Sequence, residues 1–421
     1  MGHDALFVAR SIAMEHAKRW ALPRAACFDV ALRRGDSRLR GDAVLIVAAA
    51  VIGGNGGNLP LRTPKGFASR QRQLQQGRQR IHVKRILVIR GGAIGDFILT
   101  LPALRLLREN FTSAHIEILG YKHIVALAEN RYYANATRSI DYAPLSRLFA
   151  RDAELPRDLI EYFGSFDLIV SYLFDPDEIF ATNLRRCSAA RLILGSPKFS
   201  DSEHAARQLA APLRQLGLQL ADHAATLFPS EIDRTAAAEF PGHTTTERIV
   251  AIHPGSGSEK KNWPIENWIE LGNHLLGEKP SRRGGFQAAD CGVGRFGKRP
   301  SLIAIGGEAD TGPIARLKRE WKGQPVRFAT NLPLPHLAAV LENAIFVGHD
   351  SGISHLAAAA GAKCILLFGP TDPAVWAPAN ENVKVLRAPE GDLARLPLAN
   401  VIEALCHPVR SVGPRKFLRA F

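Results

Sequence analysis

Short apolar runs alternate with amphipathic stretches along most of the chain. After residue 84, four such runs are bounded by turn residues and predict buried strands. They are "RILVIR" (85–90), "HIEILGY" (115–121), "FDLIVSYL" (166–173) and "RLILGS" (191–196), and stretches such as "EHAARQLAAPLRQLG" (203–217) predict helices. Strands that alternate with helices form parallel sheets, so the pattern indicates a doubly wound α/β fold.

The alternation restarts after a polar stretch, "EFPGHTTTE" (239–247). The later strands are predicted at "RIVAIHPG", "SLIAIGG", "VRFATN", "IFVGHD" and "KCILLFG", with "PIENWIELGNHLL" and "PLPHLAAVLENA" as helices. We therefore predict two Rossmann-like domains, 84–240 and 248–405, that face a central cleft, followed by a tail at 406–421. A Gly- and Arg-rich segment at 278–300 far exceeds the usual αβ loop of about 2 to 6 residues and predicts a surface insert.

The first 83 residues lack this alternation. Residues 53–80 are rich in Gly, Gln and Arg and predict a disordered linker, so we expect residues 1–83 to form a basic, disordered extension outside the catalytic body. The longest apolar run there, "AVLIVAAAVI", has half of the roughly 20 residues that a spanning helix needs. We expect neither a transmembrane helix nor a signal peptide.

The net charge of +14 is concentrated in two segments. Residues 1–84 hold 15 Lys and Arg against 5 Asp and Glu, and residues 279–299 hold 6 against 1. The remainder is nearly neutral, so we expect no nucleic-acid partner. The five cysteines form no C-x-x-C pair, which is typical of reduced thiols in a cytoplasmic protein.

Ligands of open α/β sheets bind at the carboxyl ends of strands, so candidate chemistry belongs in the loops there. After the first strand, Gly91, Gly92 and Gly95 allow close backbone approach, but Arg90 replaces the first glycine of a dinucleotide motif. Asp96 stands at the start of the following helix, where a carboxylate competes with phosphate. It is either a helix cap or a functional group that faces the cleft.

Two loops of the second half carry groups suited to an anion and to a ribose. In "HPGSGSEKKNWP" (253–264), Ser256 offers a hydroxyl and Lys261 a positive charge for phosphate. A simple polar loop is the alternative there, and we assign Trp263 and Trp268 to packing. In "IGGEAD", Glu308 follows a strand and either accepts hydrogen bonds from a ribose or caps the next helix.

The stretch "VGHDSGISHLAAAAGAKCILLFGPTDP" (347–373) is the most informative. Ser351 and Gly352 leave free N–H groups at a helix start, beside the Asp350 carboxylate, which indicates an anion site. His355 follows one turn later and is either a ligand contact or a buried structural residue.

Together these stretches resemble glycosyltransferase family 9, the ADP-heptose:lipopolysaccharide heptosyltransferases, over residues 84 to about 405. The most specific parts are "GDFILTLPAL" (95–104), "HPGSGSEKKNWP" and the segment 350–373. The resemblance implies the GT-B fold. It implies an acceptor in the first domain and a nucleotide sugar in the second.

The resemblance also assigns roles to single residues. Lys261 would meet the phosphate and the sugar, Glu308 the ribose, and Asp350 the transferred sugar. Ser351 and Gly352 would bind the pyrophosphate, and Asp96 would be the general base of an inverting displacement without a covalent intermediate. Further contacts are expected from Ser256 and His355 on the donor side and from Arg90, Gly91, Gly92 and Gly95 on the acceptor side.

The expected enzyme needs no cofactor or metal ion, since Lys and helix N–H groups would stabilise the departing diphosphate. Its partners would be an ADP-sugar and a lipid-linked core oligosaccharide, in the cytoplasm and peripherally at the inner membrane. Residues 1–83 and 282–299 have no place in the family pattern. Alternatives are a non-catalytic nucleotide-sugar or glycan-binding protein, a GT-B transferase with another nucleotide sugar, and a dinucleotide-dependent oxidoreductase.

Overall fold

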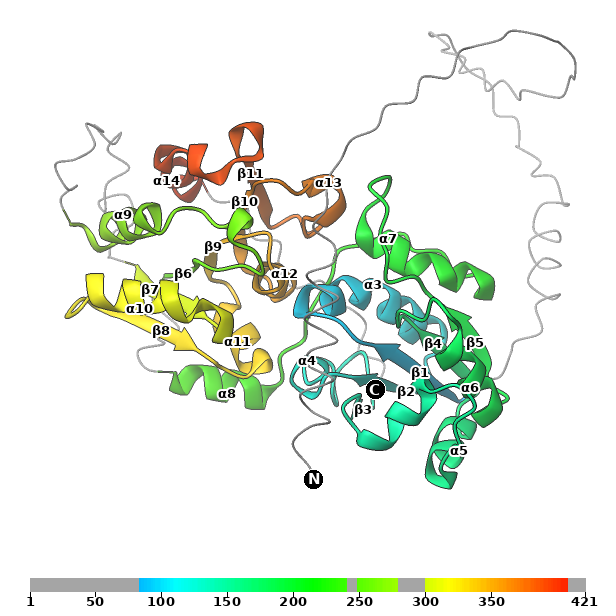
Figure 1. Cartoon of the computed structure of the whole chain (residues 1–421). Coiled ribbons are helices and arrows are strands. Elements are labelled where there is room, and N and C mark those ends of the chain that lie inside the picture. The colour runs from blue at the N-terminus through cyan, green and yellow to red at the C-terminus, as the bar shows by residue number, and fades with distance from the viewer. Residues whose placement is uncertain (1–82, 241–247, 279–299, 408–421) are drawn as a thin grey trace, which may run out of the picture. The chain divides into compact units, whose positions relative to one another are not determined.

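The computed structural model describes residues 83–240, 248–278 and 300–407 (Figure 1). The chain separates into two units between Arg78 and Gln79, and every described residue belongs to the second unit. The predicted extension at 1–83 (but for its last residue), nearly all of the insert at 278–300 and most of the predicted tail therefore lie outside the described residues.

The first half forms a five-stranded sheet with the strand order β3-β2-β1-β4-β5, and all its pairings are parallel. The strands are β1 (Arg85–Arg90), β2 (His115–Gly120), β3 (Ala136–Ser139), β4 (Leu168–Ser171) and β5 (Arg191–Leu194). The connecting helices are α3 (Ile94–Asn110), α4 (Lys122–Val125), α5 (Arg157–Gly164), α6 (Ile179–Cys187), α7 (Ala205–Ala210) and α8 (Glu231–Glu239), with 3₁₀ turns η1 (Ala143–Phe149) and η2 (Ala211–Leu216).

The second half forms a six-stranded parallel sheet, β11-β10-β9-β6-β7-β8. Its strands are β6 (Ile249–His253), β7 (Ser301–Gly306), β8 (Val326–Thr330), β9 (Ile345–His349), β10 (Lys363–Phe368) and β11 (Val383–Arg387). Its helices are α9 (Ile265–Leu276), α10 (Thr311–Glu320), α11 (Leu334–Leu341), α12 (Gly352–Ala359), α13 (Pro373–Trp376) and α14 (Leu398–Cys406). The 3₁₀ turns are η3 (Glu259–Lys261), η5 (Glu308–Asp310), η6 (Pro389–Gly391) and η7 (Leu393–Arg395).

Both sheets have the strand order of a Rossmann fold, which confirms the predicted fold class. The order reverses between β1 and β4 in one sheet and between β6 and β9 in the other. Ligands of such sheets bind in the crevice where the order reverses. The loops after β1, β6 and β9 are therefore the places where this fold positions a site.

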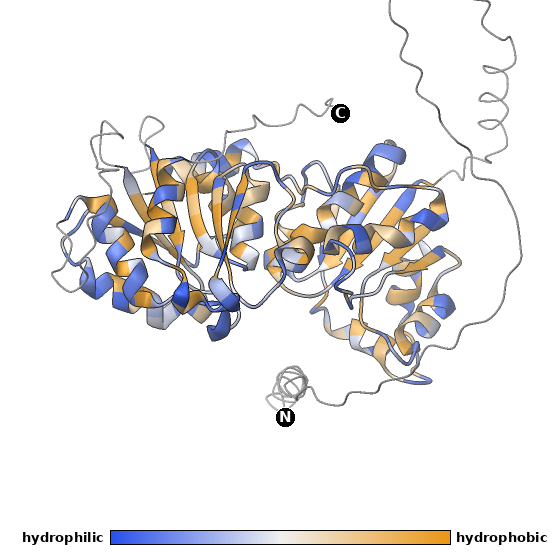
Figure 2. Ribbon diagram, turned by 90° about the horizontal axis from the view of Figure 1, so that it is seen from above, coloured by the Kyte–Doolittle hydropathy of each residue, from blue (hydrophilic) through white to orange (hydrophobic). Residues whose placement is uncertain are grey.

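Local sequence features explain why these strands and helices form and where they end. The central strands are apolar throughout because helices cover both faces of a parallel sheet, and Figure 2 shows hydrophobic residues along them. Helix α9 ends at Gly277, which adopts a left-handed conformation that glycine tolerates. The predicted helix at 203–217 divides at Pro212 into α7 and η2, since proline lacks the N–H that a continuous helix needs.

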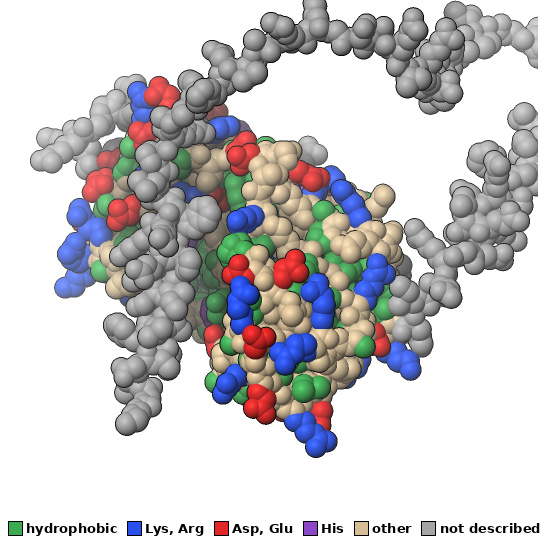
Figure 3. All heavy atoms as spheres, turned by 45° about the vertical axis from the view of Figure 1, so that its right-hand side comes forward, with side chains coloured by type: hydrophobic (Ala, Val, Ile, Leu, Met, Phe, Trp, Pro, Cys, Tyr) green, Lys and Arg blue, Asp and Glu red, His purple; other side chains and the backbone are tan. Residues whose placement is uncertain are grey.

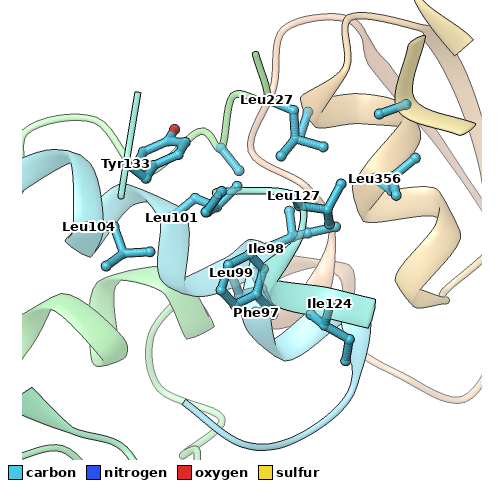
Figure 4. Close-up of a cluster of buried hydrophobic side chains, with 14 of the residues drawn as sticks. Phe97, Ile98, Leu99, Leu101, Leu104, Ile124, Leu127, Tyr133, Leu227 and Leu356 are labelled. Atoms are coloured by element: carbon cyan, nitrogen blue, oxygen red, sulfur yellow. The ribbon is translucent and has the colours of Figure 1, made fainter. Parts of the chain in front are cut away.

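Helix α3 is buried along most of its length and joins the largest apolar core. Its side chains Phe97, Ile98 and Leu101 belong to the same cluster as Leu227 and Leu356, the latter on α12 (Figure 4). The first sheet and α12 thus share one core through α3.

The surface of the described region carries mixed charge. On the face that Figure 3 presents, Lys and Arg side chains are interspersed with Asp and Glu. No helix in the described part of the chain is long and apolar enough to cross a membrane.

Candidate functional site

Asp96 lies in the first turn of α3, and the adjacent loop positions its carboxylate. Its Oδ2 accepts a hydrogen bond from the Ala93 N–H at 2.9 Å, and its Oδ1 lies 3.5 Å from Nη2 of Arg90. Asp96 therefore serves as a helix cap, one of the two interpretations of the sequence. About 33% of its side chain remains exposed, so capping does not remove the carboxylate from reach of a ligand.

Arg90 supports this arrangement from inside the protein. The residue is 5% exposed, and its Nε donates to Thr100 Oγ1 at 3.0 Å while its Nη2 donates to the carbonyl of Asp96 at 3.2 Å. Burial lowers the pKa of the guanidinium, and the Asp96 carboxylate partly opposes that change. The described contacts of Arg90 are with Asp96, Thr100 and the ring of Tyr172, which suits a residue that fixes Asp96 more than one that reaches a substrate.

Gly92 makes room for the Asp96 carboxylate. Its φ of +94° lies in a region that residues with a side chain rarely adopt, and a Cβ there would approach Asp96 Oδ2 to 2.7 Å. The loop therefore needs glycine at this position on both conformational and steric grounds.

The start of α3 packs directly against the start of α12. A Cβ on Gly352 would lie 2.9 Å from the Gly95 backbone nitrogen and 2.9 Å from Ile94 Cβ. A Cβ on Gly95 would lie 3.5 Å from Cδ2 of His355. The structure thus brings together Asp96's helix turn and the predicted anion site at Ser351 and Gly352.

His355 is buried at this contact, with 5% exposure. Burial lowers its pKa to about 4, against the opposing influence of the nearby Asp350 and Asp96 carboxylates. The imidazole is therefore neutral at physiological pH. His355 lies between the starts of α3 and α12. This position is compatible with a ligand contact and with a buried structural role, the two interpretations of the sequence.

Lys261, Asp350 and Thr371 form a compact polar group next to α12. Lys261 Nζ donates to Asp350 Oδ2 at 2.7 Å, and Thr371 Oγ1 donates to the same oxygen at 2.9 Å. The Asp350 side chain is only 9% exposed, whereas that of Lys261 is 30% exposed. The sequence placed the loop of Thr371 at this rim but did not single out its hydroxyl.

A second polar chain links the ends of β6, β7 and β9. Oδ2 of Asp310 lies 3.1 Å from Nε2 of His253 and accepts the Gly307 N–H at 2.8 Å, while Nδ1 of His253 lies 3.5 Å from Oγ of Ser351. Burial alone would raise the pKa of Asp310, but the bonds from His253 and the Gly307 N–H outweigh it, so the pKa is lowered. The sequence reasoning missed both His253 and Asp310. It had chosen Glu308, whose side chain is exposed at the start of η5.

His349 holds the loop of Lys261 in place. Its Nε2 accepts the Trp263 N–H at 2.8 Å, and its Nδ1 lies 3.3 Å from the Gly255 carbonyl. Trp263 and Trp268 are both buried, which confirms their predicted packing role. In the same loop Ser256 Oγ donates to the Ser258 carbonyl at 2.8 Å and so shapes the turn before Lys261.

Acid is expected to destabilise the fold through His349. Burial lowers the pKa of this imidazole to about 3, whereas the unfolded chain binds its proton near pH 6.5. Its stabilising contribution is therefore complete above about pH 6.5 and is lost as the pH falls toward 3, by about 2 kcal/mol at pH 5. Urea titrations at pH 7.5 and pH 5 measure the loss. His349→Gln should reduce the dependence by its own share, leaving that of buried His355, and the exposed His123→Gln should not change it. An equal slope in His349→Gln would contradict the assignment.

The described residues contain no group of three or more His, Cys, Asp or Glu side chains placed to hold a metal ion.

Comparison with known proteins indicates the class of enzyme, which the geometry of the site alone does not. The family model "Glycosyltransferase family 9 (heptosyltransferase)" matches residues 302–402, which include Glu308 and the segment from Asp350 to Thr371. Over these residues the chain is similar to glycosyltransferase family 9. It is 23% identical to lipopolysaccharide heptosyltransferase 3 of Escherichia coli K12 over 308 residues, which are 69% of this chain and 83% of that protein. It is 30% identical to lipopolysaccharide heptosyltransferase 1 of the same strain over 160 residues, covering 38% and 43% of the two chains.

Solved structures of family 9 enzymes share this fold. A family 9 glycosyltransferase from Veillonella parvula superposes with a TM-score of 0.61 at 20% identity, covering 76% of this chain and 96% of that one. The E. coli heptosyltransferase WaaC with ADP gives 0.56 at 19% identity, covering 77% and 99%. The chain thus has two Rossmann-like halves in the GT-B arrangement, and the family model and the curated relatives support a glycosyltransferase.

Proposed function

We propose that this protein is a family 9 glycosyltransferase that moves a heptose, or a related sugar, from an ADP-sugar to a lipopolysaccharide core acceptor, with inversion and with Asp96 as the general base. One observation carries the proposal. The turn of α3 that bears Asp96 touches the turn of α12 that bears Ser351 and Gly352. A carboxylate that can take a proton therefore lies beside a helix start that can bind a diphosphate.

The donor side follows from the groups around α12. The free N–H groups at its start, together with the helix dipole, stabilise a pyrophosphate. Lys261 adds a charge and, through its bond to Asp350, lies at the same helix start. Asp350 accepts from both Lys261 and Thr371, so its oxygens are positioned for hydroxyls of the transferred sugar. We assign Glu308 to the ribose and Ser256 to the turn that presents Lys261.

The reaction is a single displacement. Asp96 removes the proton from the acceptor hydroxyl, and that oxygen forms a bond to the anomeric carbon as the bond from this carbon to the diphosphate oxygen breaks. The nucleoside diphosphate leaves with the electron pair, and Lys261 and the α12 N–H groups stabilise its charge. These protein groups perform the role that a divalent ion has in other transferases, so we propose a reaction without metal or cofactor.

The acceptor belongs to the first half, on the side of Gly91 and Gly92. A lipid-linked core oligosaccharide would bring the enzyme to the cytoplasmic face of the inner membrane as a peripheral protein. The E. coli relatives are named for lipopolysaccharide substrates, which supports this acceptor class.

A transfer assay with ADP-heptose and truncated core acceptor tests the function, and we expect a glycosylated product. Calorimetric titration should show ADP binding and no NAD binding, because Arg90 occupies a position that a dinucleotide motif reserves for glycine. Binding of ADP-sugars without turnover would instead indicate a non-catalytic protein. Transfer from another nucleotide sugar alone would correct the donor.

A further inference from the structure

A cavity of about 190 Å³ lies at the carboxyl ends of β4 and β5. The loops 173–176 and 194–197 form most of its wall, with Phe180 of α6 behind them. The lining is mainly apolar and includes leucine, phenylalanine and proline side chains. Pockets for drug-sized ligands measure about 300 to 1,000 Å³, so this cavity suits a fragment about as large as one ring.

The cavity adjoins the loop that positions Asp96. A Cβ on Gly91 would lie 3.3 Å from Cδ2 of Leu173, which lines the cavity. Tyr172 packs against the cavity wall, because a Cβ on Gly195 would clash with its ring, and Arg90 Cζ lies 5.9 Å from the ring centroid. Only one layer of side chains, which includes Leu173, therefore separates a molecule in the cavity from the loop that precedes Asp96.

Internal hydrogen bonds hold both cavity loops. The Asp175 carboxylate accepts the N–H groups of Phe180 at 3.1 Å and Ala181 at 2.8 Å, at the start of α6. Ser196 Oγ accepts the Lys198 N–H and donates to the Lys198 carbonyl, both at 3.1 Å. The shape of the cavity is thus fixed before any ligand arrives, which lowers the entropy cost of binding.

Large apolar side chains stand exposed at this cavity. Phe174 is 55% exposed and Leu194 is 41% exposed, and both belong to the lining. The Lys198 ammonium lies 4.9 Å from the centroid of the Phe174 ring. An apolar patch with a polar surround marks a binding surface more often than an isolated exposed residue does.

We propose that this cavity holds a sugar ring of the acceptor, with the apolar C–H face of the ring against Phe174. The inference rests on the proposed function, because it assumes that the acceptor approaches from the Asp96 side. A pyranose ring has an apolar face and polar edges, which match a mainly apolar lining that also includes Ser171 and Ser196. The cavity therefore selects the acceptor, whereas Asp96 activates its hydroxyl.

Phe174→Ala tests the proposal in a transfer assay with a soluble core oligosaccharide freed of its lipid. Because the ring is exposed, its removal leaves the core intact. The acceptor KM should rise about tenfold, as expected for the loss of one aromatic contact. The donor KM and kcat should stay near the original values. Phe174→Trp should restore the acceptor KM, and Ile232→Ala, a change at a 78% exposed residue of α8, should leave it unaltered.

Three outcomes would overturn the assignment. The first is an unchanged acceptor KM, and the second is a changed donor KM. The third is an effect seen only with a lipid-bearing acceptor, which would indicate that the cavity binds the lipid. If the original enzyme transfers no sugar at all, it is the proposed function that fails. Calorimetric binding of the oligosaccharide to the original protein and to Phe174→Ala then still decides whether the cavity binds it.

Discussion

Asp96→Asn is expected to lower kcat by about 10²- to 10⁴-fold, the range for loss of one general base. The asparagine Oδ1 can still accept the Ala93 N–H, so the start of α3 and the fold should survive. ADP affinity should change little, because the proposed diphosphate site consists of Ser351, Gly352 and Lys261 and does not include Asp96. Single-turnover transfer with saturating donor and acceptor measures the chemical step directly.

Glu320→Gln provides the matched control for Asp96→Asn. Glu320 is a surface carboxylate that pairs with Arg316 on α10, so its loss should leave kcat unchanged. Retention of more than about a tenth of the activity in Asp96→Asn would exclude a general base there. Loss of ADP binding would move Asp96 to the donor side and contradict the assignment of the two halves.

Lys261→Met is expected to lower kcat by about 10²- to 10³-fold and to weaken ADP binding, since in the proposed mechanism it removes a positive charge where the leaving diphosphate gains negative charge. The change also leaves the buried Asp350 carboxylate with Thr371 as its one side-chain hydrogen-bond donor among the described contacts. Kinetics with varied donor concentration measure both effects.

Lys260→Met is a close control, because it removes the same charge one residue earlier from an exposed side chain. Equal losses of kcat and of ADP affinity in the two variants would show that only the total positive charge of the loop matters, and not the position of Lys261. A normal kcat in Lys261→Met would remove the lysine from the reaction, and thermal melting of each variant distinguishes such effects from unfolding.

The fold was predictable because the central strands carry strong local patterns. Every strand run of the sequence analysis lies in a sheet of the structure, and the parallel order follows from the alternation with helices. β3 and β11 were missed. They are short edge strands, "ATRS" and "VKVLR", whose polar side chains are partly exposed, so they lack the apolar run that identifies a buried strand.

The site was predictable only as a set of loops. The rule that ligands bind at strand ends located the loops of Asp96, Lys261 and Asp350, but a pairing such as His253 with Asp310 joins residues 57 positions apart and leaves no local signal. The acid chosen after β7 was Glu308, yet the η5 turn directs Asp310 inward, where the close packing of Gly255 leaves it room. Packing of this kind depends on tertiary structure.

In the proposed mechanism, the contact between Gly95 and Gly352 sets the spacing of the reacting groups. Neither glycine carries a side chain, so backbone packing sets the distance between the helix turn of Asp96 and that of Ser351. A larger residue at either position would separate the starts of α3 and α12 and, in the proposed reaction, move the acceptor hydroxyl away from the anomeric carbon. Such a fixed distance serves every sugar equally. Discrimination among donors and acceptors must therefore reside in the surrounding loops, which can vary without disturbing the chemistry.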